Sequence, residues 1–191
     1  MSSFAERLAA VQARIASARA RSACSAEVTL IAVSKTQPAE HVRALYAAGQ
    51  RHFGENYAQE LAKKADALAD LEDVAFHFIG HLQKNKIKDV IGRVRSIQTV
   101  DTSELALAID RRVNAHFDVL IEVNVASEEQ KAGVALESLP ALAEAISKTT
   151  HLRLTGLMTV PPASDDAEEA RPHFRRLREA GEALLAAGLL P

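Results

Sequence analysis

The chain has 191 residues, of which 48% are hydrophobic and 25% are charged, enough for one domain with a sizeable core. A formal net charge of −2 does not favour nucleic acid or a membrane as a partner. The single cysteine, Cys24, excludes an intrachain disulfide and a metal cage made of cysteines alone. No secretory signal and no apolar run of the roughly 18 residues needed for a transmembrane helix are present. We therefore expect a cytoplasmic protein.

Short apolar runs of strand length alternate with longer stretches of helical pattern along the chain. An amphipathic N-terminal helix is expected first, because Phe4, Leu8, Val11 and Ile15 follow helical spacing. The expected strands are residues 29–34, 51–54, 75–79, 96–100, 118–125 and 153–160. The expected helices between and after them are residues 38–49, 56–69, 85–91, 103–114, 136–149 and 166–187, with Ser103 as the N-cap of its helix.

Strands separated by helices of this length indicate βαβ units and a parallel sheet. Near-continuous apolar runs such as VLIEVNV suit strands that are covered on both faces. Six such units in succession fit either a doubly wound sheet or a TIM-type barrel, and periodicity does not distinguish the two. A barrel has eight strands and typically about 250 residues, whereas the Gly-Leu-Leu-Pro ending of this sequence resembles the lead-in to another strand.

Functional side chains of parallel α/β folds gather at the carboxyl ends of the strands. Lys35 directly follows the apolar run LIAVS, where burial would lower the pKa of its amine and make it a nucleophile. A lysine that extends into water at the rim of the sheet is the commoner arrangement. His77 and His81 have metal-ligand spacing only if both are helical, and the first is in an expected strand, so we predict no metal site. The basic run at residues 84–95 is interpreted as a solvated helix face.

Five segments together resemble a known family. The segments LIAVSKTQPAEHV, HFGENYAQE, FHFIGHLQKNK, EVNVASEEQKAGV and LTGLMTVPP are similar, in order and spacing, to the YggS/PROSC family of pyridoxal 5′-phosphate (PLP) homeostasis proteins. The resemblance extends from the N-terminal helix to the end of the chain. It implies a single PLP-binding domain over residues 1–191, a (β/α)8 barrel of the alanine racemase N-terminal type with about six βα units present in this chain.

The resemblance also implies a cofactor site. Lys35 would hold PLP as a Schiff base, and Asn56 would lie near the phenolic oxygen of the ring. His77 and Met158 would line the pocket, and Lys131 would lie near its mouth. Members of the family are described as intracellular PLP carriers or buffers without established catalytic turnover. The resemblance thus implies a monomeric protein that is not an enzyme and has apo forms of PLP-dependent enzymes as recipients.

The sequence departs from the family near its end. The family continues with a seventh strand carrying Ser-Met-Gly-Met-Ser and an eighth carrying Arg-Ile-Gly, which hold the phosphate and face the pyridine nitrogen. Neither motif occurs in residues 1–191, so we expect a fragment without strands seven and eight. Two alternatives stay open: a racemase- or lyase-like PLP enzyme on the same barrel, and a non-catalytic interaction protein that has lost PLP binding. The only two tyrosines, Tyr46 within a helix and Tyr57 at a helix start, are poor candidates for an acid–base group.

Overall fold

The computed structural model describes residues 3–23, 26–126 and 132–191. Its strands are β1 (Ala32–Val33), β2 (His52–Glu55), β3 (Ala75–Phe78), β4 (Ser96–Val100), β5 (Phe117–Glu122) and β6 (Leu152–Met158). Its helices are α1 (Phe4–Ala20), α2 (Ala39–Ala47), α3 (Ala58–Ala67), α4 (Ile87–Val90), α5 (Ser103–Asp110), α6 (Leu139–Ser147) and α7 (Arg171–Ala186). Single 3₁₀ turns lead into three of them, at Lys84–Lys86, Leu136–Ser138 and Ala167–Ala170.

The strands follow one another in the sheet in chain order, from β1 to β6. The pairs β1–β2, β4–β5 and β5–β6 are parallel. A doubly wound sheet would reverse its strand order at a switch point, whereas a barrel-type sheet adds each new strand beside the last. The observed order confirms the α/β class and selects the barrel type over the doubly wound type.

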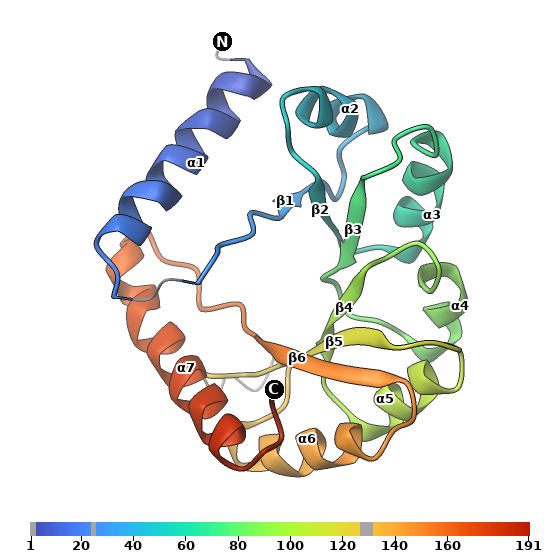
Figure 1. Ribbon diagram of the computed structural model, residues 1–191, viewed down its shortest axis with the longest axis vertical. Helices are drawn as coiled ribbons and strands as arrows, with labels where there is room; N and C mark the ends of the chain where they lie inside the picture. Colours follow the sequence, from blue (N-terminus) through green and yellow to red (C-terminus); the bar gives the residue numbers. More distant parts are fainter. Residues whose placement is uncertain (1–2, 24–25, 127–131) are drawn as a thin grey trace. The chain divides into compact units, whose positions relative to one another are not determined.

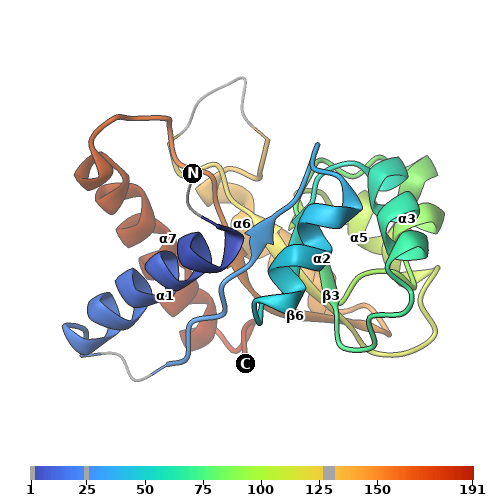
Figure 2. The ribbon, with the colours of Figure 1, turned by 90° about the horizontal axis from the view of Figure 1, so that it is seen from above.

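The chain forms two compact units, residues 1–77 and 78–191. In the first unit, α3 contacts β2 (Figure 1), and α1 contacts α2 (from above in Figure 2). Apolar side chains from both helices and from the strands make the core of this unit: Val42, Phe53, Leu61, Leu68 and Phe76. The rings of Phe53 and Phe76 lie 6.2 Å apart, and those of Phe4 and His41 join α1 to α2 at 4.9 Å.

In the second unit, α5 and α6 both pack on β6 (Figure 1). The core of this unit consists of fully buried aliphatic side chains from strands and helices: Ile97, Ile109, Val119, Ile121 and Ile146. The register of β5 with β6 shifts by one residue between Val119 and Leu120, which marks a bulge. On either side of the bulge, successive side chains point alternately to the two faces of the sheet.

Two local expectations need correction. The predicted first strand spans residues 29–34, but only Ala32 and Val33 form a strand, paired with Phe53 and Gly54. Helix α5 begins at Ser103 as expected, yet its N-cap is Thr102, whose hydroxyl accepts a hydrogen bond from the Leu105 amide at 3.3 Å. A threonine at this position satisfies one free amide of the first turn, and Ser103 lies one residue too late to do so. Within the described ranges, no helix has both the length and the apolar character needed to span a membrane.

Candidate cofactor-binding site

Lys35 lies directly beyond β1, where the sheet ends. The register pairs Val33 with Gly54, and the Ser34 amide donates to the Gly54 carbonyl at 2.9 Å. Continuing this register by two residues brings Lys35 level with Asn56. Of the two arrangements considered for Lys35, burial and extension into water, the structure shows the second, because its side chain is exposed. Its amine is thus accessible to a ligand from solution.

The two faces of this strand end differ in character. Ser34 and Glu55 are buried on the side of α3, where Lys64 contacts both of them. Lys35 follows β1 in a turn and is exposed, as is Val33 at the end of the strand. A buried polar group therefore lies directly behind an exposed strand end.

A histidine pair lies on the face of the sheet opposite to the buried Glu55. Alternation along β2 places His52 and Asn56 on one face, opposite to the buried Phe53 and Glu55. His52 Nδ1 lies 2.9 Å from His77 Nε2, and the two rings stack with centroids 5.2 Å apart. A hydrogen bond between two imidazoles needs one protonated and one free nitrogen, so the pair holds both rings in a defined orientation. The structure thus brings His77 beside His52, on the face of the sheet opposite to Glu55.

Asn56 carries an unused hydrogen-bonding group. Its Oδ1 atom is buried and has no hydrogen-bond partner among the described residues. Buried polar side-chain atoms nearly always have a partner, so this unpartnered amide oxygen fits a ligand or water that bonds to it. This amide can either accept or donate, because the side chain has an oxygen and an NH₂ group. The residues present therefore fit a polar ligand that bonds to Asn56 and reaches Lys35.

Met158 belongs to the second unit, at the carboxyl end of β6. It pairs in register with Glu122, and its carbonyl accepts from the Val123 amide at 2.8 Å. Its side chain is half-buried. Lys131 lies outside the described residues. Of the four sequence-predicted residues that the structure describes, the first unit carries Lys35, Asn56 and His77, and the second carries Met158.

Gly133 fixes the segment that follows Lys131 against β5. Its φ is +105°, and a Cβ at this position would lie only 2.8 Å from the Asn124 backbone nitrogen. The adjacent Val134 amide donates to the Glu122 carbonyl at 2.8 Å, and its carbonyl accepts from Asn124 at 2.9 Å. Only glycine allows both this conformation and this close approach.

An acidic cluster in the second unit was not predicted from the sequence. Glu122 is buried at the end of β5, and burial raises the pKa of its carboxyl. The charge of Asp101 adds to this rise in pKa, and His81 counteracts it. His81 Nδ1 lies 4.0 Å from Asp101 Oδ2, beside a hollow of about 550 Å³ that also reaches Lys84 and Thr102. The sequence feature that could have indicated this cluster is Glu122 itself, a glutamate within an otherwise apolar strand. Among the described residues, no three metal-binding side chains cluster.

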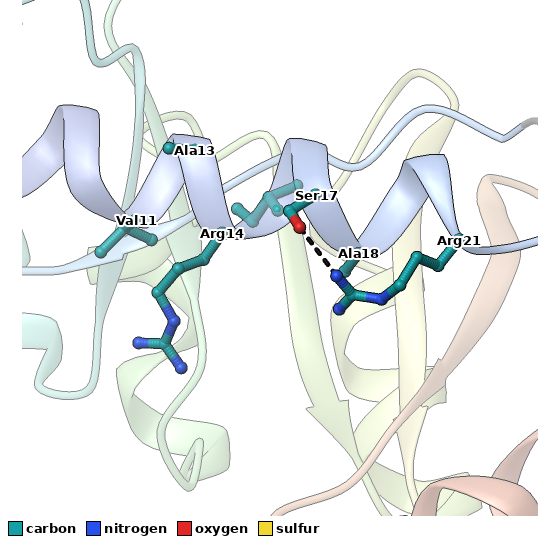
Figure 3. A pocket seen from close by; sticks show the side chains of 7 residues that line it. Val11, Ala13, Arg14, Ser17, Ala18 and Arg21 are labelled. Carbon is teal, nitrogen blue, oxygen red and sulfur yellow. Dashed lines mark hydrogen bonds between the residues drawn. The ribbon is translucent and has the colours of Figure 1, made fainter.

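A larger hollow of about 710 Å³ lies along one side of α1 (Figure 3). Its lining side chains come from this helix and from its C-cap, Arg21: Val11, Ala13, Arg14, Ile15, Ser17, Ala18 and Arg21. The guanidinium of Arg21 donates to the Ser17 hydroxyl at 2.7 Å. The hollow presents only aliphatic, hydroxyl and guanidinium groups, and no nucleophilic amine or general base. We therefore place the candidate chemistry at Lys35 and not at this hollow.

The sequence also matches known proteins. Residues 7–191 match the family described as Alanine racemase, N-terminal domain. The chain is 44% identical over 178 residues to the Pyridoxal phosphate homeostasis protein of Aquifex aeolicus, covering 91% of this chain and 78% of the relative. The chain belongs to this family. A relative of the same name in Pseudomonas aeruginosa is 44% identical over 185 residues, which cover 94% of this chain and 79% of that protein.

Solved structures agree with membership of the pyridoxal phosphate homeostasis family. PipY of Synechococcus elongatus with PLP bound is 33% identical, with a TM-score of 0.79 over 98% of this chain and 84% of PipY. A protein of unknown function from Bifidobacterium adolescentis has a TM-score of 0.87 at 34% identity, covering 97% and 80% of the two chains. Alanine racemase from Corynebacterium glutamicum, at 19% identity, has a TM-score of 0.63 over 85% of this chain and 46% of its own, and shows the shared fold. The fold class and the family resemblance are thereby confirmed.

Proposed function

We propose that this protein binds PLP through Lys35 and acts in PLP homeostasis as a carrier or buffer, without catalytic turnover. The observation that carries the proposal is the exposed amine of Lys35 at the end of β1, level with the unpartnered amide of Asn56. Relatives support the proposal in two ways: proteins named for PLP homeostasis are 44% identical to this chain over the aligned residues, and PipY has been solved with PLP bound.

Each candidate site residue of the first unit has a defined part in this proposal. PLP supplies an aldehyde whose carbon forms a C=N bond to a primary amine, with loss of water. Lys35 provides that amine, and its exposure lets the cofactor enter and leave. The Asn56 amide would hydrogen-bond to the phenolic oxygen. His77, which contacts His52, would line the pocket beside the ring.

Met158 and Lys131 complete the proposed set of contacts. Met158 would pack on the cofactor through its thioether, a flexible and polarisable group. Lys131 would add positive charge near the dianionic phosphate of PLP. Both assignments rest on the motifs GLM and QKAG, which match the family.

The positions of the two tyrosines support a role without catalytic turnover. The Tyr46 hydroxyl donates to Asp73, and the Tyr46 ring lies under the Arg51 guanidinium with 4.1 Å between guanidinium carbon and ring centroid. Arg51 precedes β2, so this tyrosine is engaged at the amino end of the strand, whereas Lys35 is at the carboxyl end of β1. Tyr57 is exposed next to the start of α3. Neither is set to move a substrate proton at Lys35.

The test is borohydride reduction of the protein after incubation with PLP, followed by mass mapping of modified peptides. We expect a near-visible absorbance band and a phosphopyridoxyl group on Lys35. Lys35→Ala should remove both signals. Lys63→Ala, which removes an exposed lysine of the same unit, should leave them unchanged and serves as the matched control. Modification spread evenly over surface lysines, or an adduct that survives in Lys35→Ala, would refute the assignment.

Two further assays separate the proposal from its alternatives. Transfer of PLP to an apo form of a PLP-dependent enzyme, faster than release into buffer, would support a carrier acting on such recipients. Exchange of the α-proton of amino acids in deuterated water would instead support the racemase- or lyase-like alternative.

We also propose that the protein works as a monomer in the cytoplasm. Its mass by light scattering and its distribution on cell fractionation test these two statements.

A further inference from the structure

A buried ion pair lies behind the strand that carries Lys35. Lys64 Nζ is 2.6 Å from Glu55 Oε1, and the side chains are 8% and 0% exposed. Lys64 stands on the buried face of α3 together with Leu61 and Leu68. Removing two charges from water is costly, so a buried pair often stabilises a protein no better than apolar side chains of equal size. Its presence in the core therefore calls for a role in specifying geometry.

The pair holds the residue before Lys35. Lys64 Nζ donates to the Ser34 carbonyl at 2.5 Å, and the Ser34 hydroxyl donates to Glu55 Oε1 at 2.6 Å. Ser34 is thus held through its carbonyl and its hydroxyl, in addition to the hydrogen bond that its amide donates to the Gly54 carbonyl. Because Glu55 directly precedes Asn56, the same contacts also fix the neighbouring strand end.

The same cluster holds the residue after Lys35. Thr36 has a φ of +61°, a left-handed conformation that is unfavourable for a residue with a branched side chain. Its amide donates to Glu60 Oε2 at 2.8 Å, and that oxygen lies 3.5 Å from Lys64 Nζ. Such a conformation persists only where surrounding contacts determine it. Lys64 therefore reaches both neighbours of Lys35, one directly and one through Glu60.

We propose that Lys64 is a positioning residue, which sets the direction of Lys35 and the position of Asn56 from the buried side of the sheet. The inference rests on the proposed function of Lys35. Lys64 acts from the buried side, because its ammonium contacts oxygens of the buried Ser34 and Glu55, whereas the Lys35 side chain is exposed. The ammonium of Lys64 has three hydrogens and three oxygen partners, on Ser34, Glu55 and Glu60, so it is fully satisfied.

The test compares how fast PLP labels Lys35 and Lys63 within the same molecules, by borohydride trapping at short times. The double variant Glu55→Gln/Lys64→Met removes both buried charges, so it avoids the unpaired charge that Lys64→Met alone would leave. We expect the Lys35-to-Lys63 labelling ratio to fall roughly 10- to 100-fold in the double variant, because small misplacements of a reacting group cost this much in rate. The absorbance band should still form at long times, since the amine of Lys35 itself remains.

Two other variants complete the design. Glu60→Ala changes a side chain that is 37% exposed, removes the acceptor of the Thr36 amide, and should lower the ratio by a smaller factor. Lys63→Met, on the same helix, is the control for folding and for the shape of the absorbance band. A double variant with the circular dichroism spectrum of the control and an unchanged labelling ratio would overturn the inference, as would an unchanged ratio in Glu60→Ala. Failure of the wild-type protein to label at Lys35 would instead refute the proposed function.

Discussion

Gly133→Ala should destabilise the protein far more than Gly92→Ala, although both glycines have positive φ, of 105° and 85°. An added Cβ at Gly92 meets nothing within 4 Å, so this variant bears only the left-handed backbone penalty of about 1–2 kcal/mol. At Gly133 the Cβ would also lie 2.8 Å from the Asn124 nitrogen and 3.0 Å from the Val123 carbonyl carbon. These contacts are backbone atoms that cannot rotate away. The overpacking should add about 1–3 kcal/mol.

The assay is urea unfolding of both variants, followed by circular dichroism under identical conditions. A shift of the midpoint at constant m-value reports a change in stability. Gly133→Ala should also speed amide exchange at Val134 and Asn124, because the Asn124 amide donates to the Val134 carbonyl at 2.9 Å. Equal losses of stability for the two variants would refute the argument that close backbone approach, and not φ alone, requires a glycine at position 133.

Three further predictions concern single side chains. Lys64→Met should lower the free energy of unfolding by about 3–5 kcal/mol, because Glu55 is left buried without its cation. Urea titration of this variant and of Glu55→Gln/Lys64→Met should show that the double variant regains part of the lost stability. A double variant as unstable as Lys64→Met would contradict this cause. The raised pKa of Glu122 means that the folded state holds its proton more tightly, so stability falls as the pH rises from the ordinary pKa of 4.5 to the raised value. Glu122→Gln should therefore stabilise the protein at neutral pH and flatten that part of the pH profile, and a loss of stability at pH 7 would oppose this reasoning. Thr102→Ala should cost about 1 kcal/mol and Ser103→Ala only roughly a few tenths, and equal melting temperatures of the two variants would count against the Thr102 cap.

Much of the fold followed from local pattern. The strand at Ser96–Val100 has the bounds that its apolar run predicts, and most other strands lie within two residues of their expected positions. Helix α2 is followed by Gly49 with a positive φ, as the glycine at this point predicts. These features depend on side chains that are neighbours along the chain, so the sequence alone contains them. The position of Lys35 at the end of an apolar run, and the motifs that relate the chain to its family, belong to the same class.

The sequence by itself thus determined the βα order, the family and the identity of the cofactor candidates. Only the tertiary structure decided that Lys35 is exposed and that Lys64 is buried behind it. Lys64 and Ser34 are 30 residues apart, and their contact depends on how α3 packs on β1 and β2. Helical periodicity indicates that position 64 faces inward, next to Leu61 and Leu68. It does not indicate which oxygen atoms lie there. Partners of a buried charge are set by packing between distant segments, and no local pattern encodes that geometry.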